Sequence, residues 1–282
     1  MSAILQQTPL MPFGVELDLD LADPANADAV RASFVEHGLL VFRQQQLSMD
    51  EQKRIVGYLG PVCEHWSTVG YVSNKRAGGI LGNAEVSFHS DNSYTSDPLL
   101  AVSLFGIEAP YETTSTRFAS GTRALEKLPS ILRERISRLH GINLFAASDE
   151  AQADRQRLEG YPDDCPRYVH PLIITDPVSG VQSLYALQMH TAAVASVSPS
   201  ESEALLCELF GYLYEPENIY EHKWRKGDFV IWSNFRYQHA RGALDPQHER
   251  TLQRVCISNG QPQVYEDALP ARIVKGRIGA MA

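Results

Sequence analysis

The sequence predicts a mainly β fold with flanking helices, arranged as one antiparallel sandwich with helical buttresses. Three observations support this fold class. Short apolar segments typical of strands recur along most of the 282 residues, a few helical stretches interrupt them, and neither an internal repeat nor a linker divides the chain. Sandwiches and barrels of this size occur as single domains, so we expect one domain over residues 1–282.

The first 60 residues contain two predicted strands and two predicted helices. Alternating apolar and acidic residues indicate a half-buried strand, and a continuous apolar run indicates a strand buried on both faces. The helix between these strands ends at Gly38, and the next begins at Ser48, where Glu51 completes a capping box. The predicted strands span residues 15–21 and 39–43, and the predicted helices span residues 23–37 and 48–59.

Two later segments lack a clear period. Residues 61–82 are rich in glycine, and we expect either a lid-like loop over a site or a mobile surface loop. Residues 148–166 are acidic and polar, which indicates an exposed insertion.

The remainder is rich in strands. A turn at residues 176–180 indicates a β-hairpin between residues 168–175 and 182–187. Ser198 begins a helix through residue 213, with Glu201 at its capping-box position. The other predicted helices span residues 121–128 and 129–139, and the other strands span residues 101–108, 115–119, 141–146, 220–224, 229–232 and 251–258.

Composition and charge narrow the class of protein. The 44% hydrophobic and 21% charged content is ordinary for a soluble globular chain, and no apolar run is long enough to span a membrane. A net charge of −9 argues against a nucleic-acid partner, because a nucleic-acid-binding surface normally needs a basic face. The N-terminus lacks a signal-peptide pattern and the four cysteines are dispersed, so we expect reduced thiols and a cytoplasmic protein. The sequence does not decide between a monomer and a homo-oligomer.

His89-Ser90-Asp91 is the first candidate for chemistry. In extended backbone, His89 and Asp91 project to the same face. An imidazole beside a carboxylate supplies two ligands of the 2-His-1-carboxylate site of non-heme Fe(II) oxygenases. The triplet is common, so the rest of the site decides its meaning.

A second histidine should complete the ligand set. His239 stands out because it follows a turn, a buried strand and a polar bend, a rigid element that delivers a side chain to a fixed point. His170 begins an apolar strand, where capping or packing is the more ordinary role. The later histidines considered are His170, His190, His222, His239 and His248.

Arg250 and Arg254 lie four residues apart on a predicted strand, so both face the same side, roughly 13 Å apart. Two inward guanidinium groups require anionic partners, because an unpaired buried charge is very costly. A dicarboxylate would satisfy Arg250 through two parallel hydrogen bonds. The alternative is a pair of surface arginines on an edge strand.

Together these residues resemble the TauD/TfdA (taurine dioxygenase-like) family of Fe(II)/2-oxoglutarate-dependent oxygenases. His89-Ser90-Asp91 corresponds to the family's His-x-Asp, and His239, 150 residues later, to its distal histidine. Arg250, 11 residues further, falls where the family binds the far carboxylate of 2-oxoglutarate. Thr116, 27 residues after His89, matches a threonine beside that carboxylate.

The sequence departs from the family pattern at two places. Residues 232–236, Trp-Ser-Asn-Phe-Arg, resemble the family's Trp-Asp-Asn-Arg, with Ser233 in place of the aspartate and an inserted Phe235. The usual glycine pair before Thr116 is replaced by Thr-Thr-Ser at residues 113–115. The ligand positions and Arg250 are unchanged, so these departures bear on the substrate more than on the chemistry.

The resemblance implies a double-stranded β-helix (jelly roll) of the clavaminate synthase/TauD-like type. It implies that His89, Asp91 and His239 hold Fe(II), and that Arg250 and Thr116 fix 2-oxoglutarate. With O2 as the oxidant, a substrate C–H bond is oxidised and succinate and CO2 are released. Hydroxylation is the default, desaturation and epoxidation use the same residues, and the presence of Asp91 argues against halogenation.

The resemblance also indicates where the substrate binds. Arg254 falls where family members hold an anionic substrate group, which predicts an acidic small molecule. If Arg254 pairs instead with a protein carboxylate, a neutral apolar substrate fits equally well. Tyr94, Phe88 and the loop from Trp66 to Tyr71 are candidates to line the pocket, with core packing as the alternative for Phe88.

Two other functional classes share parts of this pattern. A jelly-roll ligand-binding protein that lacks catalysis would bind no metal, or a metal without turnover. A zinc hydrolase also uses two histidines and a carboxylate. Neither needs a guanidinium at one cosubstrate length from the metal, so Arg250 favours the oxygenase.

Overall fold

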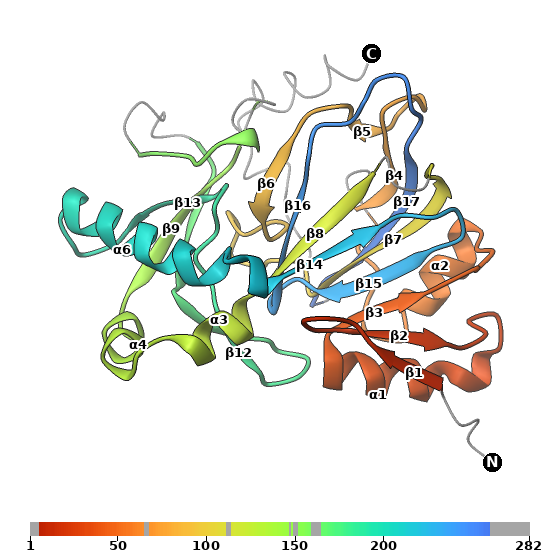
Figure 1. Ribbon diagram of the computed structural model, residues 1–282, viewed down its shortest axis with the longest axis horizontal. Helices are drawn as coiled ribbons and strands as arrows, with labels where there is room; N and C mark the ends of the chain where they lie inside the picture. Colours follow the sequence, from red (N-terminus) through yellow and green to blue (C-terminus); the bar gives the residue numbers. More distant parts are fainter. Residues whose placement is uncertain are drawn as a thin grey trace.

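The computed structural model describes residues 6–64, 68–110, 114–146, 148, 152–158 and 165–259. Within this part of the chain, two sheets face each other across an apolar core, and helices pack outside them (Figure 1). The predicted mainly β fold with flanking helices is therefore confirmed.

The larger sheet has eight strands. Its neighbours are antiparallel except at two pairs, where β2 runs parallel to β3 and β4 runs parallel to β5. In spatial order its strands are β1 (Gln6–Pro9), β2 (Val15–Asp18), β3 (Leu39–Phe42), β15 (Phe229–Ser233), β7 (Ala101–Glu108), β17 (Thr251–Ile257), β4 (Val69–Ser73) and β5 (Ile80–Leu81).

The smaller sheet has four antiparallel strands that lie against the larger one. In spatial order they are β14 (Ile219–Lys223), β8 (Ser115–Ser120), β16 (Tyr237–Arg241) and β6 (Val86–His89). Phe118 from β8 meets Trp232 from β15 edge to face, with ring centroids 5.1 Å apart. The core between the sheets is therefore continuous up to the strands that carry the predicted ligands.

Two helices cover the outer face of the larger sheet, α1 (Ala27–His37) and α2 (Met49–Val56) (Figure 1). A 3-10 turn, Pro24–Asn26, precedes α1, and Gly38 ends it in the left-handed conformation with φ +67°. The predicted capping box at Ser48 is present with both reciprocal hydrogen bonds to Glu51. Both helix boundaries follow from local sequence signals.

A second helical layer lies at the other end of the molecule. Its core combines α3 (Gly121–Lys127), α4 (Ser130–Ile136) and α6 (Pro199–Leu213) with small sheets. One sheet contains β10 (Arg167–Pro171), β9 (His140–Leu144) and β13 (Thr191–Val194), and the other contains β11 (Ile173–Thr175) and β12 (Gln182–Leu184). A second 3-10 turn spans Pro216–Asn218.

The predicted hairpin is present only in part. β11 and β12 pair antiparallel around the turn at residues 176–180, as predicted. The segment before β11 forms a separate strand, β10, which pairs with β9. The two strands divide at Leu172, a fully buried residue whose N–H donates to the carbonyl of Leu139.

The segment at residues 61–82 is more regular than predicted. It contains β4, which pairs antiparallel with β17, and β5, which extends the sheet. A strand whose partner lies some 180 residues away gives little local signal, which explains the difference. Trp66 lies outside the described residues.

The described residues of the segment at 148–166 are exposed in part, as predicted: Ser148, Ala153, Asp154, Arg157 and Leu158 are exposed. Among its described residues, Gln152 and Gln156 are buried. The hydroxyl of Ser87 on β6 donates to the carbonyl of Ala153 at 2.8 Å, and Arg155 pairs with Glu203 of α6. This part of the segment therefore packs between β6 and the second helical layer.

All four cysteines are free thiols, with Cys165 and Cys256 buried, Cys63 half-buried and Cys207 exposed. Over the described part of the chain, none of the helices combines the length and apolar character needed to span a membrane.

Candidate active site

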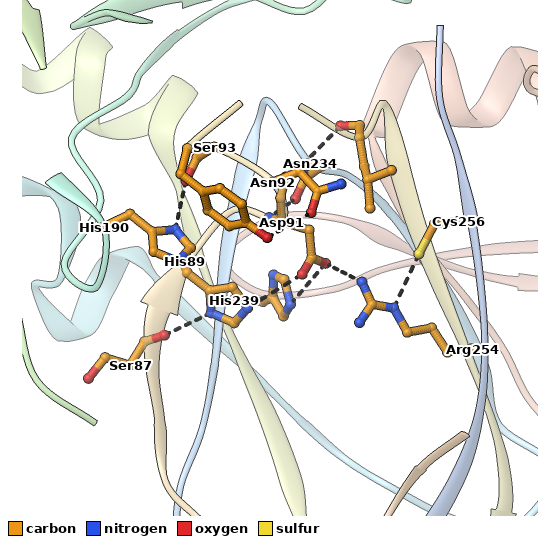
Figure 2. Close-up of polar contacts among 12 residues, drawn as sticks. Ser87, His89, Asp91, Asn92, Ser93, His190, Asn234, His239, Arg254 and Cys256 are labelled. Atoms are coloured by element: carbon orange, nitrogen blue, oxygen red, sulfur yellow. Dashed lines mark hydrogen bonds and ion pairs between the residues drawn. The ribbon is translucent and has the colours of Figure 1, made fainter. Parts of the chain in front are cut away.

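The three predicted ligands converge at the end of the smaller sheet. β6 ends at His89, and Asp91 follows two residues later. The neighbouring strand β16 runs antiparallel to β6 and places His239 directly opposite His89, with ring centroids 4.1 Å apart. Strand pairing thus closes a sequence separation of 150 residues (Figure 2).

The three side chains form a compact cluster in which His89 is buried and Asp91 and His239 are partly buried. One donor atom from each lies within 4.8 Å of the others. The Asp91 carboxylate faces Nε2 of His89 at 3.8 Å and Nε2 of His239 at 3.7 Å. Two imidazole nitrogens and one carboxylate on one side of a point match the 2-His-1-carboxylate arrangement.

The protonation states also suit a divalent metal ion. Nδ1 of His89 lies 2.8 Å from the carbonyl of Ser87, which can only accept, so Nδ1 carries the hydrogen and Nε2 presents its lone pair. Burial lowers the pKa of His89 and, together with the neighbouring His89 ring, that of His239. Both imidazoles are therefore neutral, as metal binding requires.

Asp91 is held ionised by its neighbours. Burial acts to raise the pKa of its carboxyl, but the guanidinium of Arg254 and the imidazoles of His239 and His89 keep that pKa well below its usual range. Nη2 of Arg254 lies 3.1 Å from Oδ2 of Asp91. The donor set consequently fits a divalent metal without further deprotonation.

Asn234 fixes the backbone of Asp91. Its Oδ1 accepts from the Asp91 N–H at 2.8 Å, and its Nδ2 donates to the carbonyls of Asp91 and Leu99, each at 2.9 Å. Asn234 lies in the turn between β15 and β16, and β16 carries His239. Its amide therefore links the backbone of Asp91 to the strand that carries the third ligand. Figure 2 shows Asn234 above Asp91.

The structure also accounts for Ser233 in place of the family's aspartate. The Ser233 hydroxyl donates to Oδ2 of Asp176 at 3.0 Å, and both side chains are buried. Asp176 comes from the turn between β11 and β12. The carboxylate missing from the motif is thus supplied by a different element.

Arg250 and Thr116 meet in the same cavity. Arg250 precedes β17, is 3% exposed, and donates from Nη2 to Oγ1 of Thr116 on β8 at 3.3 Å. Nε1 of Trp224 donates to the same oxygen at 2.9 Å. Burial, with a smaller effect of Arg241, lowers the pKa of Arg250 well below its usual value. A carboxylate that binds beside this buried guanidinium would stabilise its charged form.

Arg254 lies beside the ligand cluster, where it pairs with Asp91. Its Nε donates to Sγ of Cys256 at 3.2 Å, two residues along the same strand face. Arg254 therefore has a protein carboxylate as one partner and still borders the cavity.

Phe88 and Tyr94 lie elsewhere. Phe88 points to the opposite face of β6 from His89 and stacks on Tyr214 with ring centroids 4.7 Å apart, because alternate residues of a strand face opposite sides. Tyr94 packs edge-on against Phe145 at 4.9 Å and against His190 at 5.6 Å. Neither is among the described residues that line the cavity.

The remaining histidines also have other neighbours. His170 bonds through Nε2 to the carbonyl of Thr95, and His222 faces Asp228 at 3.2 Å. His248 is exposed beside Asp245. His190 bonds to Ser93 at 2.6 Å and lies edge-on to His89 with ring centroids 5.9 Å apart, so it neighbours the ligand cluster.

Some of the cavity's residues were not predicted from the sequence. Arg241 lies two residues after His239 on β16, and its position could have been found from the alternation of that strand. The apolar walls come from both sheets, and no local pattern marks them. The cavity is lined by Val72, Leu81, Val86, His89, Asp91, Val102, Leu104, Thr116, Trp232, His239, Ala240, Arg241, Arg250 and Arg254.

The sequence is similar to a known protein family and to several of its characterised members. Residues 6–256 match the family described as taurine catabolism dioxygenase TauD, TfdA family. The alpha-ketoglutarate-dependent 2,4-dichlorophenoxyacetate dioxygenase of Cupriavidus pinatubonensis is 27% identical, over 87% of this chain and 94% of that protein. An alpha-ketoglutarate-dependent sulfate ester dioxygenase of Pseudomonas putida is 28% identical, over 93% of this chain and 90% of that protein.

Solved structures extend the likeness to the fold. A taurine dioxygenase from Burkholderia xenovorans superposes with a TM-score of 0.75 at 25% identity, over 91% of both chains. AAD-2, solved in complex with Mn(II) and N-oxalylglycine, gives a TM-score of 0.77 at 25% identity, over 93% of this chain and all of that one. The double-stranded β-helix is therefore confirmed. The chain belongs to the TauD/TfdA family and is an alpha-ketoglutarate-dependent dioxygenase.

Proposed function

We propose that this enzyme hydroxylates a C–H bond of a small organic acid. In this proposal His89, Asp91 and His239 are the ligands of Fe(II). Arg250 and Thr116 bind the far carboxylate of 2-oxoglutarate. One observation carries the proposal: a His-Asp-His cluster and the buried guanidinium of Arg250 border the same cavity. That pairing suits a cosubstrate with a metal-chelating end and a charged end.

Iron and 2-oxoglutarate, when bound, supply the oxidation, and the protein contributes position and exclusion of water. The neutral Nε2 atoms of His89 and His239 and the ionised carboxylate of Asp91 offer three ligands from one side. A metal ion held by these three ligands would keep coordination positions for the cosubstrate and oxygen. Arg254 restrains one oxygen of Asp91, which favours binding of the metal through the other oxygen.

Arg250 and Thr116 provide a fixed end point for the dicarboxylate. The Thr116 oxygen already accepts from Trp224 and Arg250, so its own hydrogen is available to donate to an incoming carboxylate. Because Arg250 is buried, its interaction with that carboxylate is worth more than it would be at the surface.

The charge of the cavity supports an acidic substrate. Three arginines line it, and among the described lining residues Asp91 is the one carboxylate. A divalent metal would add two positive charges, and 2-oxoglutarate offsets only two. An organic anion with an apolar body would complement the remaining charge and the walls formed by Val102 and Leu104. Relatives named for phenoxyacetate and sulfate ester substrates are consistent with this class.

The test is anaerobic addition of Fe(II) and 2-oxoglutarate to the protein, followed by admission of air. We expect a weak visible charge-transfer band under anaerobic conditions, then succinate release that accelerates with the matching substrate in a panel of organic acids and neutral analogues. Asp91→Asn should abolish the band, whereas Asp245→Asn, at an exposed aspartate, should keep it.

Other outcomes would contradict parts of the proposal. A metal-bound protein without the band or succinate would indicate binding without turnover, and hydrolysis supported by zinc would indicate a hydrolase. Acceleration by neutral analogues alone would contradict the acidic substrate while leaving the iron and 2-oxoglutarate sites intact.

A further inference from the structure

Arg241 is a second buried arginine in the cavity, and neither the ligand set nor the proposed carboxylate site uses it. It lies on β16 two residues after His239 and is 6% exposed. Its Nη2 donates to the carbonyl of Leu81 at 2.9 Å and also to the carbonyl of Ala84. The side chain therefore joins the smaller sheet to the segment at residues 80–84, which lies between β4 and β6.

Arg241 and Arg250 act on each other electrostatically. Arg241 adds to the effect of burial in lowering the pKa of Arg250. Two guanidinium groups that share one buried cavity raise each other's free energy, and a carboxylate bound between them would lower it. The described carboxylate of the cavity, Asp91, is already engaged by Arg254.

Arg250 is connected to the same segment through its backbone. Its N–H donates to Oδ1 of Asn74 at 2.9 Å, and Nδ2 of Asn74 donates to Oδ1 of Asn83 at 2.9 Å. Both arginines are therefore linked by hydrogen bonds to residues 80–84, one through its guanidinium and one through Asn74.

The segment needs such links because its backbone is unfavourable. Leu81 has φ +69°, in the left-handed region that a branched apolar residue rarely adopts, and Gly82 has φ +39°. Leu81 also lines the cavity. A local conformation of this kind persists only where its surroundings hold it.

We infer that Arg241 is a cosubstrate-binding residue: together with Arg250 it binds the far carboxylate of 2-oxoglutarate, and through Leu81 and Ala84 it couples cosubstrate binding to the ordering of residues 80–84. This inference rests on the proposed role of Arg250 and extends it to a residue outside the family motif. A carboxylate bound by both guanidinium groups holds Arg241 in place. The hydrogen bonds from Arg241 to the carbonyls of Leu81 and Ala84 are then more persistent, and residues 80–84 are more ordered.

Arg236 offers a matched control. It is also buried, at 8% exposed, and it donates to two backbone carbonyls, those of Val35 and Glu36, each at 3.1 Å. It is not among the described residues that line the cavity. Arg236→Met removes the same chemistry as Arg241→Met at a site without cosubstrate.

Two measurements test the inference. The first is the dissociation constant of 2-oxoglutarate, from the anaerobic Fe(II) charge-transfer band, and the second is hydrogen exchange of amides 80–84 with and without 2-oxoglutarate. Arg241→Met should raise the dissociation constant about tenfold or more, the value of one lost charge-assisted bond, and abolish the protection of amides 80–84. Arg236→Met should leave both close to wild type.

A second variant, Arg241→Lys, keeps the inference testable if Arg241→Met does not fold. Arg241→Lys keeps the charge but lacks the planar fork that reaches two carbonyls and a carboxylate together, so it should weaken both effects without removing them. Wild-type affinity and protection in Arg241→Lys or Arg241→Met would overturn the inference. So would a raised KM for the organic acid with unchanged 2-oxoglutarate affinity, which would assign Arg241 to the substrate. Failure of the proposed function differs, because wild type itself would then show no band.

Discussion

Asp91 is the residue on which most of the site's interactions converge. Asn234 holds its backbone from both sides, Arg254 holds one carboxylate oxygen, and His89 and His239 flank it. The carboxylate is thus ionised and oriented before a metal arrives. Neighbours that orient a ligand in this way commonly change metal affinity 10- to 100-fold, as an order of magnitude.

Asn234→Ala should lower the affinity for Fe(II) by about 10- to 100-fold, because the Asp91 backbone loses both of its bonds to the amide. Titration of metal-free protein with Fe(II) under anaerobic conditions measures it. Asn218→Ala is the control, since Asn218 is equally buried and donates to the carbonyls of Ser120 and Leu213. Equal metal affinity in the two variants would contradict the role given to Asn234.

Ser233→Asp restores the aspartate of the family motif but should destabilise this protein. The new carboxylate would face the buried Asp176, which now accepts the Ser233 hydroxyl, and an uncompensated buried charge costs about 3 kcal/mol. Denaturant unfolding should show this loss, and adding Asp176→Asn should recover much of it. A stable single variant, or no recovery in the double variant, would argue against the exchange of carboxylates.

At the scale of elements, pairing between strands and the ends of helices set the positions of functional side chains. The register of β6 and β16 determines the contact between His89 and His239. The end of α1 determines where β3 begins, because Gly38 turns the chain directly into Leu39.

Gly38→Ala should cost more stability than Gly180→Ala, although both glycines have positive φ, +67° and +74°. At Gly180 the added methyl meets open space, so only the backbone cost of about 1 kcal/mol applies. At Gly38 it would lie 2.8 Å from Nη1 of Arg236, which must move. Thermal or denaturant unfolding compares the two, and equal losses would mean that Arg236 yields freely.

Local signals explain which elements could be predicted. The end of α1 at Gly38 and the capping box at Ser48 are encoded within a few residues, and the structure confirms both. β4 and β10 were not predicted as they occur, since each is defined by a distant partner, β17 and β9. Periodicity carries no information about such partners.

The same distinction applies to the site. His89, Asp91, His239, Arg250 and Thr116 were identified because their types and spacings resemble a family pattern, and the structure brings these residues together. Arg241 is outside that pattern, although alternation along β16 places it on the same face as His239, and the apolar walls carry no local signal. Their role depends on which faces of the two sheets meet, which is a property of the folded molecule.

At the scale of the whole molecule, the site depends on both sheets. His89, Thr116 and His239 belong to the smaller sheet, while Arg254 lies on β17 of the larger sheet and Arg250 immediately precedes that strand. Any loss of packing between the sheets therefore separates the metal ligands from the guanidinium groups. Conditions that weaken the fold should weaken cosubstrate binding in parallel.

Acid should be one such condition. Burial lowers the pKa of His170, and it lowers that of His222 despite the hydrogen bond to Asp228. The unfolded chain then binds more protons than the folded protein below about pH 6.5, so the free energy of unfolding decreases as the pH is lowered through that range. Chemical unfolding of metal-free protein at several pH values measures this slope.

His170→Gln should reduce that slope, because it removes one of the groups that protonate on unfolding. His248→Gln should leave the slope unchanged, since His248 is exposed beside Asp245. A slope that is equal in wild type and His170→Gln, or stability that rises on acidification, would contradict the assignment of buried neutral histidines.

The most direct test of the central claim is an anomalous-difference map, recorded at the iron edge, from crystals grown anaerobically with Fe(II) and 2-oxoglutarate. The account predicts one peak bounded by Nε2 of His89, Nε2 of His239 and the carboxylate of Asp91, with the far carboxylate of 2-oxoglutarate against Arg250. A peak at another site, or density for 2-oxoglutarate that leaves Arg250 without contact, would contradict it.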